Sequence, residues 1–134
     1  MDKNDLKWIL LFIILGFLIC CGNISIQSQE KPVRYINVYL NISNYSNAWM
    51  EADNIYFFSQ EGKTIKGSTI ITNNEDKKAK FNLKLEGELF DNRIISISES
   101  SFELETGKEK QIEIKLNITK DAKSSYSGKI KITS

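Results

Sequence analysis

Apolar and polar residues alternate along most of the chain after residue 32. In the run 33–42, Ile36, Val38 and Leu40 share one face, and tyrosines and asparagines share the other. A period of two predicts a β-strand that buries one face and leaves the other in water. The same pattern occurs at 80–86, 110–118 and 126–133, and shorter strand candidates lie at 55–59, 65–72, 93–98 and 101–104.

Turn-forming residues separate these runs, at 60–63, 73–78, 90–92 and 105–108. Seven or eight short strands at this spacing predict an antiparallel two-sheet sandwich, because each sheet has one apolar face to bury. We therefore expect an all-β fold over residues 30–134. The stretch "NYSNAWMEAD" at 44–53 fits no strand pattern and is compatible with a short helix or an aromatic-rich loop.

Residues 1–29 follow a different pattern. From Trp8 to Cys21 every residue is apolar or small, and no charge occurs between Lys7 and Glu30. A helix packed on a protein core has a polar face, and this run has none, so it predicts a hydrophobic helix that enters lipid or is read by the secretion machinery. Fourteen helical residues span about 21 Å, less than the roughly 30 Å of a bilayer's hydrocarbon core.

Three interpretations of this segment stay open. It is a cleaved signal peptide with Cys20 and Gly22 as the small residues at −3 and −1, an uncleaved anchor that meets the membrane through residues 8–22, or a lipoprotein leader with Cys21 as the acceptor. All three predict a single-pass, lipid-anchored or secreted protein with residues 30–134 outside the cytoplasm. Residues 1–29 are then a leader with a short linker, and 30–134 are the folded domain.

Composition excludes several kinds of chemistry. The chain has no histidine, and its only cysteines are Cys20 and Cys21 in the leader. Serine triads that depend on histidine, papain-like sites and zincins are therefore excluded from the domain, and we expect no metal, no cofactor and no catalytic residue. Lysine plus arginine number 18 against 17 aspartate plus glutamate, without a basic stripe, which argues against a nucleic-acid partner.

Carboxylates are the remaining candidates for chemistry. The turn at 73–76 offers oxygens that calcium would accept, but its spacing is not that of an EF-hand loop and lysines follow, so we expect a solvated turn. Glu103 and Glu105 project from one strand face, as an acid/base pair would, and we expect an exposed polar face there instead.

The aromatic residues near the start of the domain form the most suggestive group: Tyr35, Tyr39, Tyr45 and Trp49, followed by Met50. Tyrosine and tryptophan provide large, stiff contact area at interfaces, so this group is a candidate binding patch. The alternative is that Trp49, or the neighbouring Tyr56, Phe57 and Phe58, covers the tyrosine face of the strand.

Asn-x-Ser/Thr sequons occur at Asn23, Asn41, Asn44 and Asn117. In an extracytoplasmic domain these asparagines are candidate N-glycosylation sites. Asn41 and Asn117 lie on predicted polar faces, and Asn44 lies in the irregular stretch, so all three within the domain are accessible in this prediction.

The order "EGKTIKGSTIITNNEDKKAKFNLKLEG", "ISISESSFELETGKEKQIEIKLNI" and "SSYSGKIKITS" resembles immunoglobulin-like sandwich modules of bacterial and archaeal cell-surface proteins. The resemblance covers about residues 54–134 and implies that the final strand pairs inside a sheet. It leaves residues 33–53 outside, so the strand there is either an additional edge strand or the true first strand.

These features predict a protein that acts by contact. We expect a non-enzymatic surface module that binds or scaffolds another envelope protein or a surface polymer. One alternative is a stalk or stator-like component of a surface filament or secretion machine. A remote alternative is a carboxylate-dependent hydrolase, which requires two acidic groups converging in a cleft.

Overall fold

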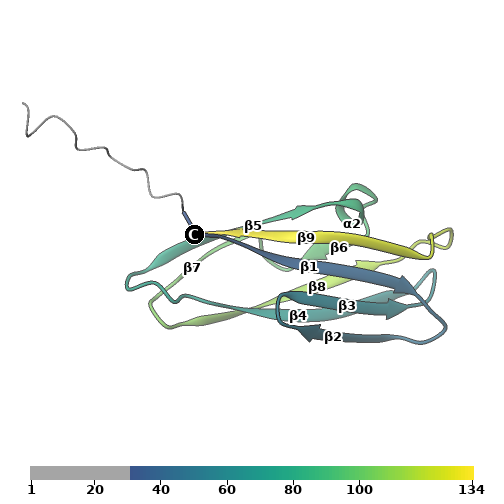
Figure 1. The fold of residues 1–134 in the computed structure, drawn as a ribbon, viewed down its shortest axis with the longest axis horizontal. Helices are drawn as coiled ribbons and strands as arrows, with labels where there is room; N and C mark the ends of the chain where they lie inside the picture. The colour runs from purple at the N-terminus through teal and green to yellow at the C-terminus, as the bar shows by residue number, and fades with distance from the viewer. Residues whose placement is uncertain (1–30) are drawn as a thin grey trace, which may run out of the picture. The chain divides into compact units, whose positions relative to one another are not determined.

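Two β-sheets make up residues 31–134, the part of the chain that the computed structural model describes (Figure 1). They confirm the predicted all-β fold and are consistent with the predicted two-sheet sandwich. The described residues contain nine strands and not seven or eight, because the strand Asn47–Glu51 was not predicted. The larger sheet contains, in spatial order, β2 (Asn47–Glu51), β3 (Asn54–Ser59), β1 (Val33–Ile42), β9 (Ser125–Thr133), β5 (Ala79–Glu86) and β7 (Ser101–Leu104). The smaller sheet contains β4 (Thr64–Thr72), β8 (Glu109–Asn117) and β6 (Ile95–Ile97).

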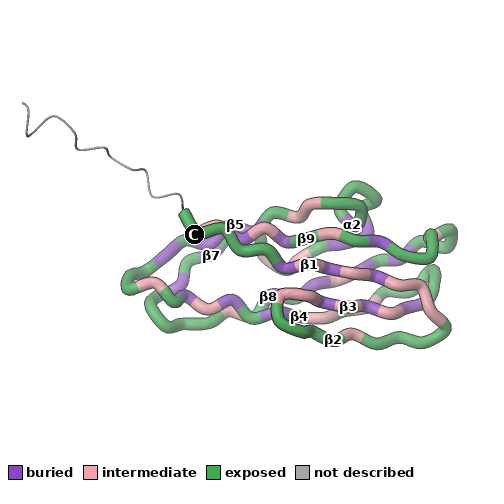
Figure 2. Tube along the Cα trace, viewed as in Figure 1, coloured by how far each residue is buried: buried purple, intermediate pink, exposed green. Residues whose placement is uncertain are grey.

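The core lies between the inner faces of the two sheets and follows the alternation of the sequence (Figure 2). On β1 the aliphatic residues Ile36, Val38 and Leu40 are fully buried, while the residues between them are exposed or half-buried. Strand β8 repeats this pattern from the opposite sheet. Burying one face of each sheet removes apolar surface from water, at about 25 cal/mol per Å², and this is the main stabilisation of a sandwich.

One pairing differs from the antiparallel prediction, because β1 and β3 run parallel. The chain leaves β1, crosses the end of β3 and returns along its far side as β2, so β3 lies between them. The crossing loop is held by backbone and side-chain contacts: Ser43 N–H donates to the Ser59 carbonyl at 2.9 Å, and Gln60 Nε2 donates to the Asn44 carbonyl at 2.8 Å. Strand β1 is consequently an interior first strand and not an edge.

The stretch 44–53 was expected to be a helix or a loop, and the structure corrects this. It contains β2, which pairs antiparallel with β3 through a turn at Ala52 and Asp53. Four of the five β2 residues are exposed, so the strand has no buried stripe from which a period of two could be recognised.

The predicted turn at 90–92 is partly helical, because α2 covers Glu88–Asp91. Its entry requires Gly87, which has φ = 95° and whose added Cβ would lie 3.0 Å from the Gly128 Cα. Leu89 anchors the helical turn in the core, where it is fully buried. The turn therefore holds Glu88 close to β9.

The turn at 73–76 was expected to be solvated, and this is wrong for Asn73 alone, since Asn74 and Asp76 are exposed and Glu75 is half-buried. Asn73 is fully buried, and its side chain bonds three backbone groups. Its Nδ2 donates to the carbonyls of Lys77 and Leu104, both at 2.9 Å, and its Oδ1 accepts from Glu75 N–H at 2.9 Å. Asn73 thus fixes two loops against each other, a structural role that leaves its amide no free oxygen for calcium.

The predicted leader helix and Cys21 lie outside the described residues. Within 31–134, no helix has the length and apolar character needed to cross a membrane.

Candidate functional site

Five aromatic rings form a stacked array on the outer face of the larger sheet. We call this array, consisting of Tyr39, Tyr45, Trp49, Tyr56 and Phe58, the aromatic face. Adjacent ring centroids lie 5.2 Å apart for Tyr39–Tyr56, 5.5 Å for Trp49–Tyr56, 5.0 Å for Trp49–Phe58 and 5.5 Å for Tyr45–Phe58, with interplanar angles of 9–27°. Strand register produces the array, because Tyr39, Tyr56 and Trp49 are direct cross-strand neighbours.

The array is only partly covered. Trp49 keeps 43% of its surface exposed and Tyr45 keeps 52%, while Tyr56 and Phe58 are half-buried by the rings beside them. Tyr56 and Phe58 therefore cover their neighbours on this face, and a large aromatic surface still meets water. The binding patch itself stays a prediction. Phe57 points the other way and is fully buried in the core.

The structure brings together three of the four residues predicted as a binding patch. Tyr35 is 41% exposed but lies four residues before Tyr39 on β1, where the Lys129 Nζ lies 4.9 Å from its ring centroid. Met50 faces the opposite side of β2, and its Sδ accepts a hydrogen bond from the Thr69 hydroxyl. Neither residue belongs to the aromatic face.

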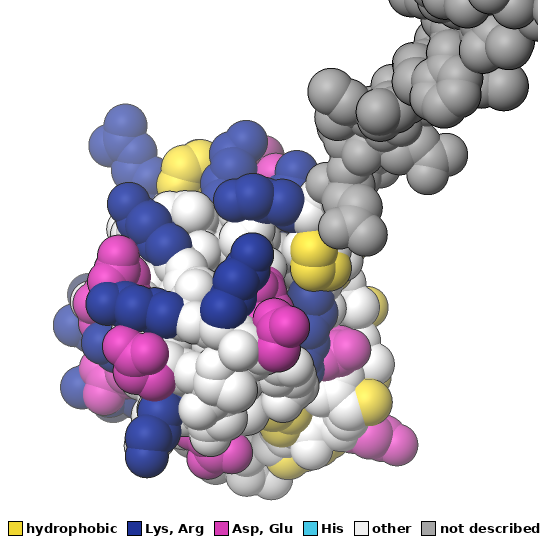
Figure 3. Space-filling model, turned by 90° about the vertical axis from the view of Figure 1, so that its left-hand side faces the viewer, with side chains coloured by type: hydrophobic (Ala, Val, Ile, Leu, Met, Phe, Trp, Pro, Cys, Tyr) yellow, Lys and Arg dark blue, Asp and Glu magenta, His cyan; other side chains and the backbone are white. Residues whose placement is uncertain are grey.

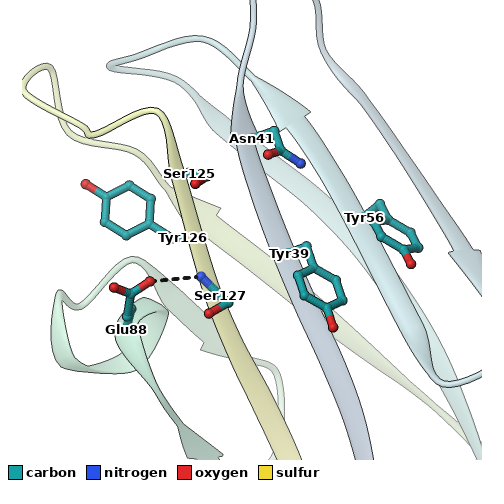
Figure 4. Close-up of a pocket in the computed structure, with 7 residues that line it drawn as sticks. All are labelled: Tyr39, Asn41, Tyr56, Glu88, Ser125, Tyr126 and Ser127. Atoms are coloured by element: carbon teal, nitrogen blue, oxygen red, sulfur yellow. Dashed lines mark hydrogen bonds between the residues drawn. The ribbon is translucent and has the colours of Figure 1, made fainter.

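A pocket adjoins the array at the Tyr39 end (Figure 4). Its volume is about 240 Å³, below the roughly 300 Å³ at which sites for drug-sized ligands begin. Two ring side chains of the aromatic face form one wall, and hydroxyl, amide and carboxylate groups form the others. The lining residues are Tyr39, Asn41, Tyr56, Glu88, Ser125, Tyr126 and Ser127.

Glu88 supplies the only carboxylate among these lining residues. Its Oε1 accepts a hydrogen bond from Lys123 Nζ, and its Oε2 accepts one from Ser127 N–H at 3.3 Å. The bond from Lys123, followed by the bond from Ser127, holds the pKa of Glu88 below its ordinary value of 4.5. The pocket therefore presents an ionised carboxylate whose charge is balanced by Lys123 at neutral pH.

This lowered pKa predicts a pH dependence. The stabilisation from ionised Glu88 is fully present above its unfolded-state pKa and is lost as the pH falls through the lower folded-state pKa. Glu88→Gln should therefore unfold at a slightly lower urea concentration than the wild-type chain at about pH 7, and the difference should be smaller at about pH 3. Urea titrations at both pH values measure it, and an equal difference at both would contradict the assignment.

The other half of the same sheet face is charged. Outward charged side chains are lysines on β9, lysines and one glutamate on β5, and Glu103 on β7. The Lys78 Nζ lies 2.7 Å from a carboxylate oxygen of Glu103 and 3.8 Å from one of Glu105. The hydrogen bond between Lys78 and Glu103 raises the pKa of Lys78 and lowers that of Glu103. Figure 3 shows lysine and acidic side chains interspersed on the end of the sandwich near the C-terminus. Glu103 and Glu105 are thus exposed, as expected from the sequence, and both lie close to Lys78.

The three sequons of the domain lie on the surface or close to it. Asn44 is exposed in the loop after β1, and Asn117 is exposed at the end of β8, where its Oδ1 accepts a hydrogen bond from Thr64. Asn41 is half-buried and lines the pocket, so a glycan attached there would occupy it. Glycosylation of all three stays a prediction.

Sequence reasoning missed part of the site. It placed Tyr56 and Phe58 only as cover, although their alternation with buried Ile55 and Phe57 already put them on the outer face. It gave no role to Glu88 or Ser127, which reach the pocket from distant parts of the chain. Across residues 31–134, no three histidine, cysteine, aspartate or glutamate side chains are grouped so that they could hold a metal ion.

No protein-family model, curated protein or solved structure matches this chain.

Proposed function

We propose that this chain is a non-enzymatic module of the cell surface that binds another envelope component through the aromatic face. The exposure of Trp49 and Tyr45 within a five-ring array is the observation that carries this proposal. Monomeric proteins rarely leave a continuous aromatic surface in water without a partner for it. Tyrosine and tryptophan are also the residues that contribute most to binding energy at interfaces.

The sandwich belongs, in this proposal, to the immunoglobulin-like modules that the sequence resembles. In that fold strand E lies between B and D in one sheet, and strand F lies between C and G in the other. Here β8 lies between β4 and β6, and β9 lies between β5 and β1, which supports the assignment. Strand β1 then takes the place of the last strand G, although it comes first in the chain.

Binding accounts for the pocket better than hydrolysis does. A carboxylate-dependent hydrolase needs two acidic groups around the scissile bond, one of them with a raised pKa so that it can donate a proton. Glu88 is the single acid lining this pocket, and its pKa is lowered. The group is suited to accept hydrogen bonds from a ligand.

The predicted leader supports a location outside the cytoplasm for the domain. An uninterrupted apolar run that ends just before the domain is typical of exported or membrane-anchored proteins, and the absence of cysteine in residues 31–134 fits a domain that needs no thiol chemistry there. The domain would act outside the cytoplasm, whichever of the three fates its leader has.

Co-sedimentation with envelope material tests the proposal. The full-length chain, reconstituted in phosphatidylcholine nanodiscs and made without N-glycans, is mixed with insoluble envelope fractions from the source organism. We expect saturable binding that weakens about tenfold or more in Trp49→Ala, because truncating an aromatic residue that anchors an interface costs about 1.4 kcal/mol or more.

Lys84→Ala is the matched control. Lys84 is exposed on the same face of the same sheet, in its charged half, so its removal should leave binding within about twofold of the wild-type chain. Equal binding of both variants and the wild-type chain would overturn the proposal that the aromatic face is the contact surface.

A further inference from the structure

The aromatic face and its pocket also indicate what they bind. We propose that the ligand is a neutral polysaccharide, whose pyranose rings lie against the aromatic side chains and one of which enters the pocket beside Glu88. This inference rests on the proposed function and adds the chemical class of the ligand.

The aromatic half of this sheet face carries no charge, which favours a neutral ligand. Two cross-strand rows of outward side chains run from β9 to β2, and none of the eight carries a charge. They are Ser127, Tyr39, Tyr56 and Trp49 in one row, and Ser125, Asn41, Phe58 and Asn47 in the other. A charged polymer on this surface would lose hydration without gaining ionic partners, whereas a neutral one would not. The neutrality is local, because the β9–β5–β7 half of the same face is dense in lysine and glutamate.

The end of the ring stack suits a sugar that enters the pocket. One side of a pyranose ring presents mainly C–H groups, which are attracted to the negative face of an aromatic ring. The rings stack in the order Tyr39, Tyr56, Trp49, Phe58 and Tyr45, so Tyr39 has a stacked ring on one side only, and it lines the pocket. Stacking also holds the rings in place before binding, so little side-chain entropy is lost on contact.

The polar groups at the rim of the pocket suit the hydroxyl groups of a sugar. A sugar hydroxyl both donates and accepts hydrogen bonds, and the pocket offers groups for both roles. The amide of Asn41 and the hydroxyls of Ser125 and Ser127 can donate or accept, and the Glu88 carboxylate accepts only. Because Lys123 and Ser127 already position Glu88, the carboxylate is fixed before a ligand arrives.

Two other polymers that use aromatic surfaces fit less well. Single-stranded nucleic acid stacks on aromatic rings but also needs cations along its backbone. None of the residues that line the pocket is a cation, and Lys123 beside it is paired with Glu88. A proline-rich peptide docks in aromatic grooves, yet it brings carbonyl acceptors and few donors. It would leave the Glu88 carboxylate without a donor from the ligand.

The test separates the ligand class from the proposed function. Envelope material is divided into a protease-treated, delipidated polysaccharide fraction and a protein fraction, and each is titrated with the full-length chain in nanodiscs. Cellohexaose, chitohexaose, a galacturonate hexamer, oligo-dT and a proline-rich decapeptide serve as defined probes. In a Trp8→Phe background Trp49 is the sole tryptophan, so its fluorescence reports directly on contact with the aromatic face.

We expect binding to the polysaccharide fraction, its loss after periodate cleavage of vicinal diols, and a Trp49 emission shift with a neutral hexasaccharide that exceeds the shift with the galacturonate hexamer. Trp49→Ala and Glu88→Gln should each weaken binding about tenfold, and Lys84→Ala should leave it unchanged.

Binding confined to the protein fraction, or preference for oligo-dT or the peptide, would overturn the polysaccharide while leaving the proposed function intact. Binding to neither fraction would overturn both. Attachment to empty nanodiscs, or to the galacturonate hexamer as tightly as to the neutral probes, would count against a neutral polysaccharide.

Discussion

Replacing Phe57 with alanine is expected to lower the free energy of unfolding by about 3–5 kcal/mol, the usual cost of truncating a buried phenylalanine. Phe57 is fully buried, and its ring spans the space between the two sheets. A Cβ added at Gly67 on β4 would lie only 2.9 Å from the Phe57 ring, so the ring and the glycine are packed as a complementary pair. Truncation leaves a cavity that neither sheet can close without bending. Urea unfolding of the full-length chain, followed by circular dichroism, measures the loss.

Phe58→Ala is the matched control for this prediction. Phe58 is the next residue on β3, with the same side chain, but it faces outward and is half-buried between Trp49 and Tyr45. Its loss should cost only about 1 kcal/mol, the range of an aromatic pair at a partly exposed site. It should nevertheless weaken ligand binding, because it removes one ring of the aromatic face. If Phe57→Ala and Phe58→Ala lost equal stability, the assignment of inner and outer faces on β3 would be wrong.

The strands that the sequence predicted well are those with one buried face. The alternation of apolar and polar residues located β1, β5, β8 and β9 almost to the residue, because each of these strands shows the pattern in its own sequence. Strand β2 could not be recognised in this way because it is exposed on nearly all sides. The turn that joins β2 to β3 gave no hairpin signal in the sequence either. It lacks the usual Asn-Gly pair, and the positive φ of 50° is adopted by Ala52.

The alternation that locates a strand does not predict which other strands pair with it. Nothing in the run 33–42 specifies that β1 lies between β9 and a parallel β3, because the choice depends on where the crossing loop passes and on what the rest of the sheet leaves unpaired. The resemblance to immunoglobulin-like modules covered the strands from β3 onward and so could not place β1. This interior position means that the strand next to the leader stabilises both halves of the larger sheet.

The same distinction applies to the site. Tyr39 and Trp49 could be identified as candidate binding residues because their chemistry is unusual for exposed positions. Their assembly into one array depends on cross-strand register, and the pocket depends on Glu88 and Ser127, which are 39 residues apart in the chain. The types of the side chains predicted an aromatic surface. Its extent and its polar rim follow only from the pairing of the strands in the folded chain.

The burial of Asn73 could not be predicted from the composition of its turn. Asparagine followed by acidic residues and lysines is typical of a solvated turn, yet the Asn73 side chain is fully buried and satisfies two carbonyls and one N–H. Its backbone also joins the two loops, since Asn73 N–H donates to the Lys108 carbonyl at 2.9 Å and Gly107 N–H donates to the Asn73 carbonyl at 2.8 Å. The amide is the centre of the contact between the 73–78 and 105–108 turns.

Asn73→Ala should therefore lower the free energy of unfolding by about 2–4 kcal/mol, because it removes three hydrogen bonds and leaves buried backbone groups without partners. For a domain of this size such a loss corresponds to a fall in Tm of roughly 10–20 °C, which differential scanning calorimetry of the full-length chain resolves. The adjacent Asn74 is exposed, so Asn74→Ala should change stability by no more than about 0.5 kcal/mol. Because Asn73 lies outside the aromatic face, Asn73→Ala should keep wild-type ligand affinity below its melting transition. An Asn73→Ala chain as stable as Asn74→Ala would mean that the buried amide is not what joins the two turns.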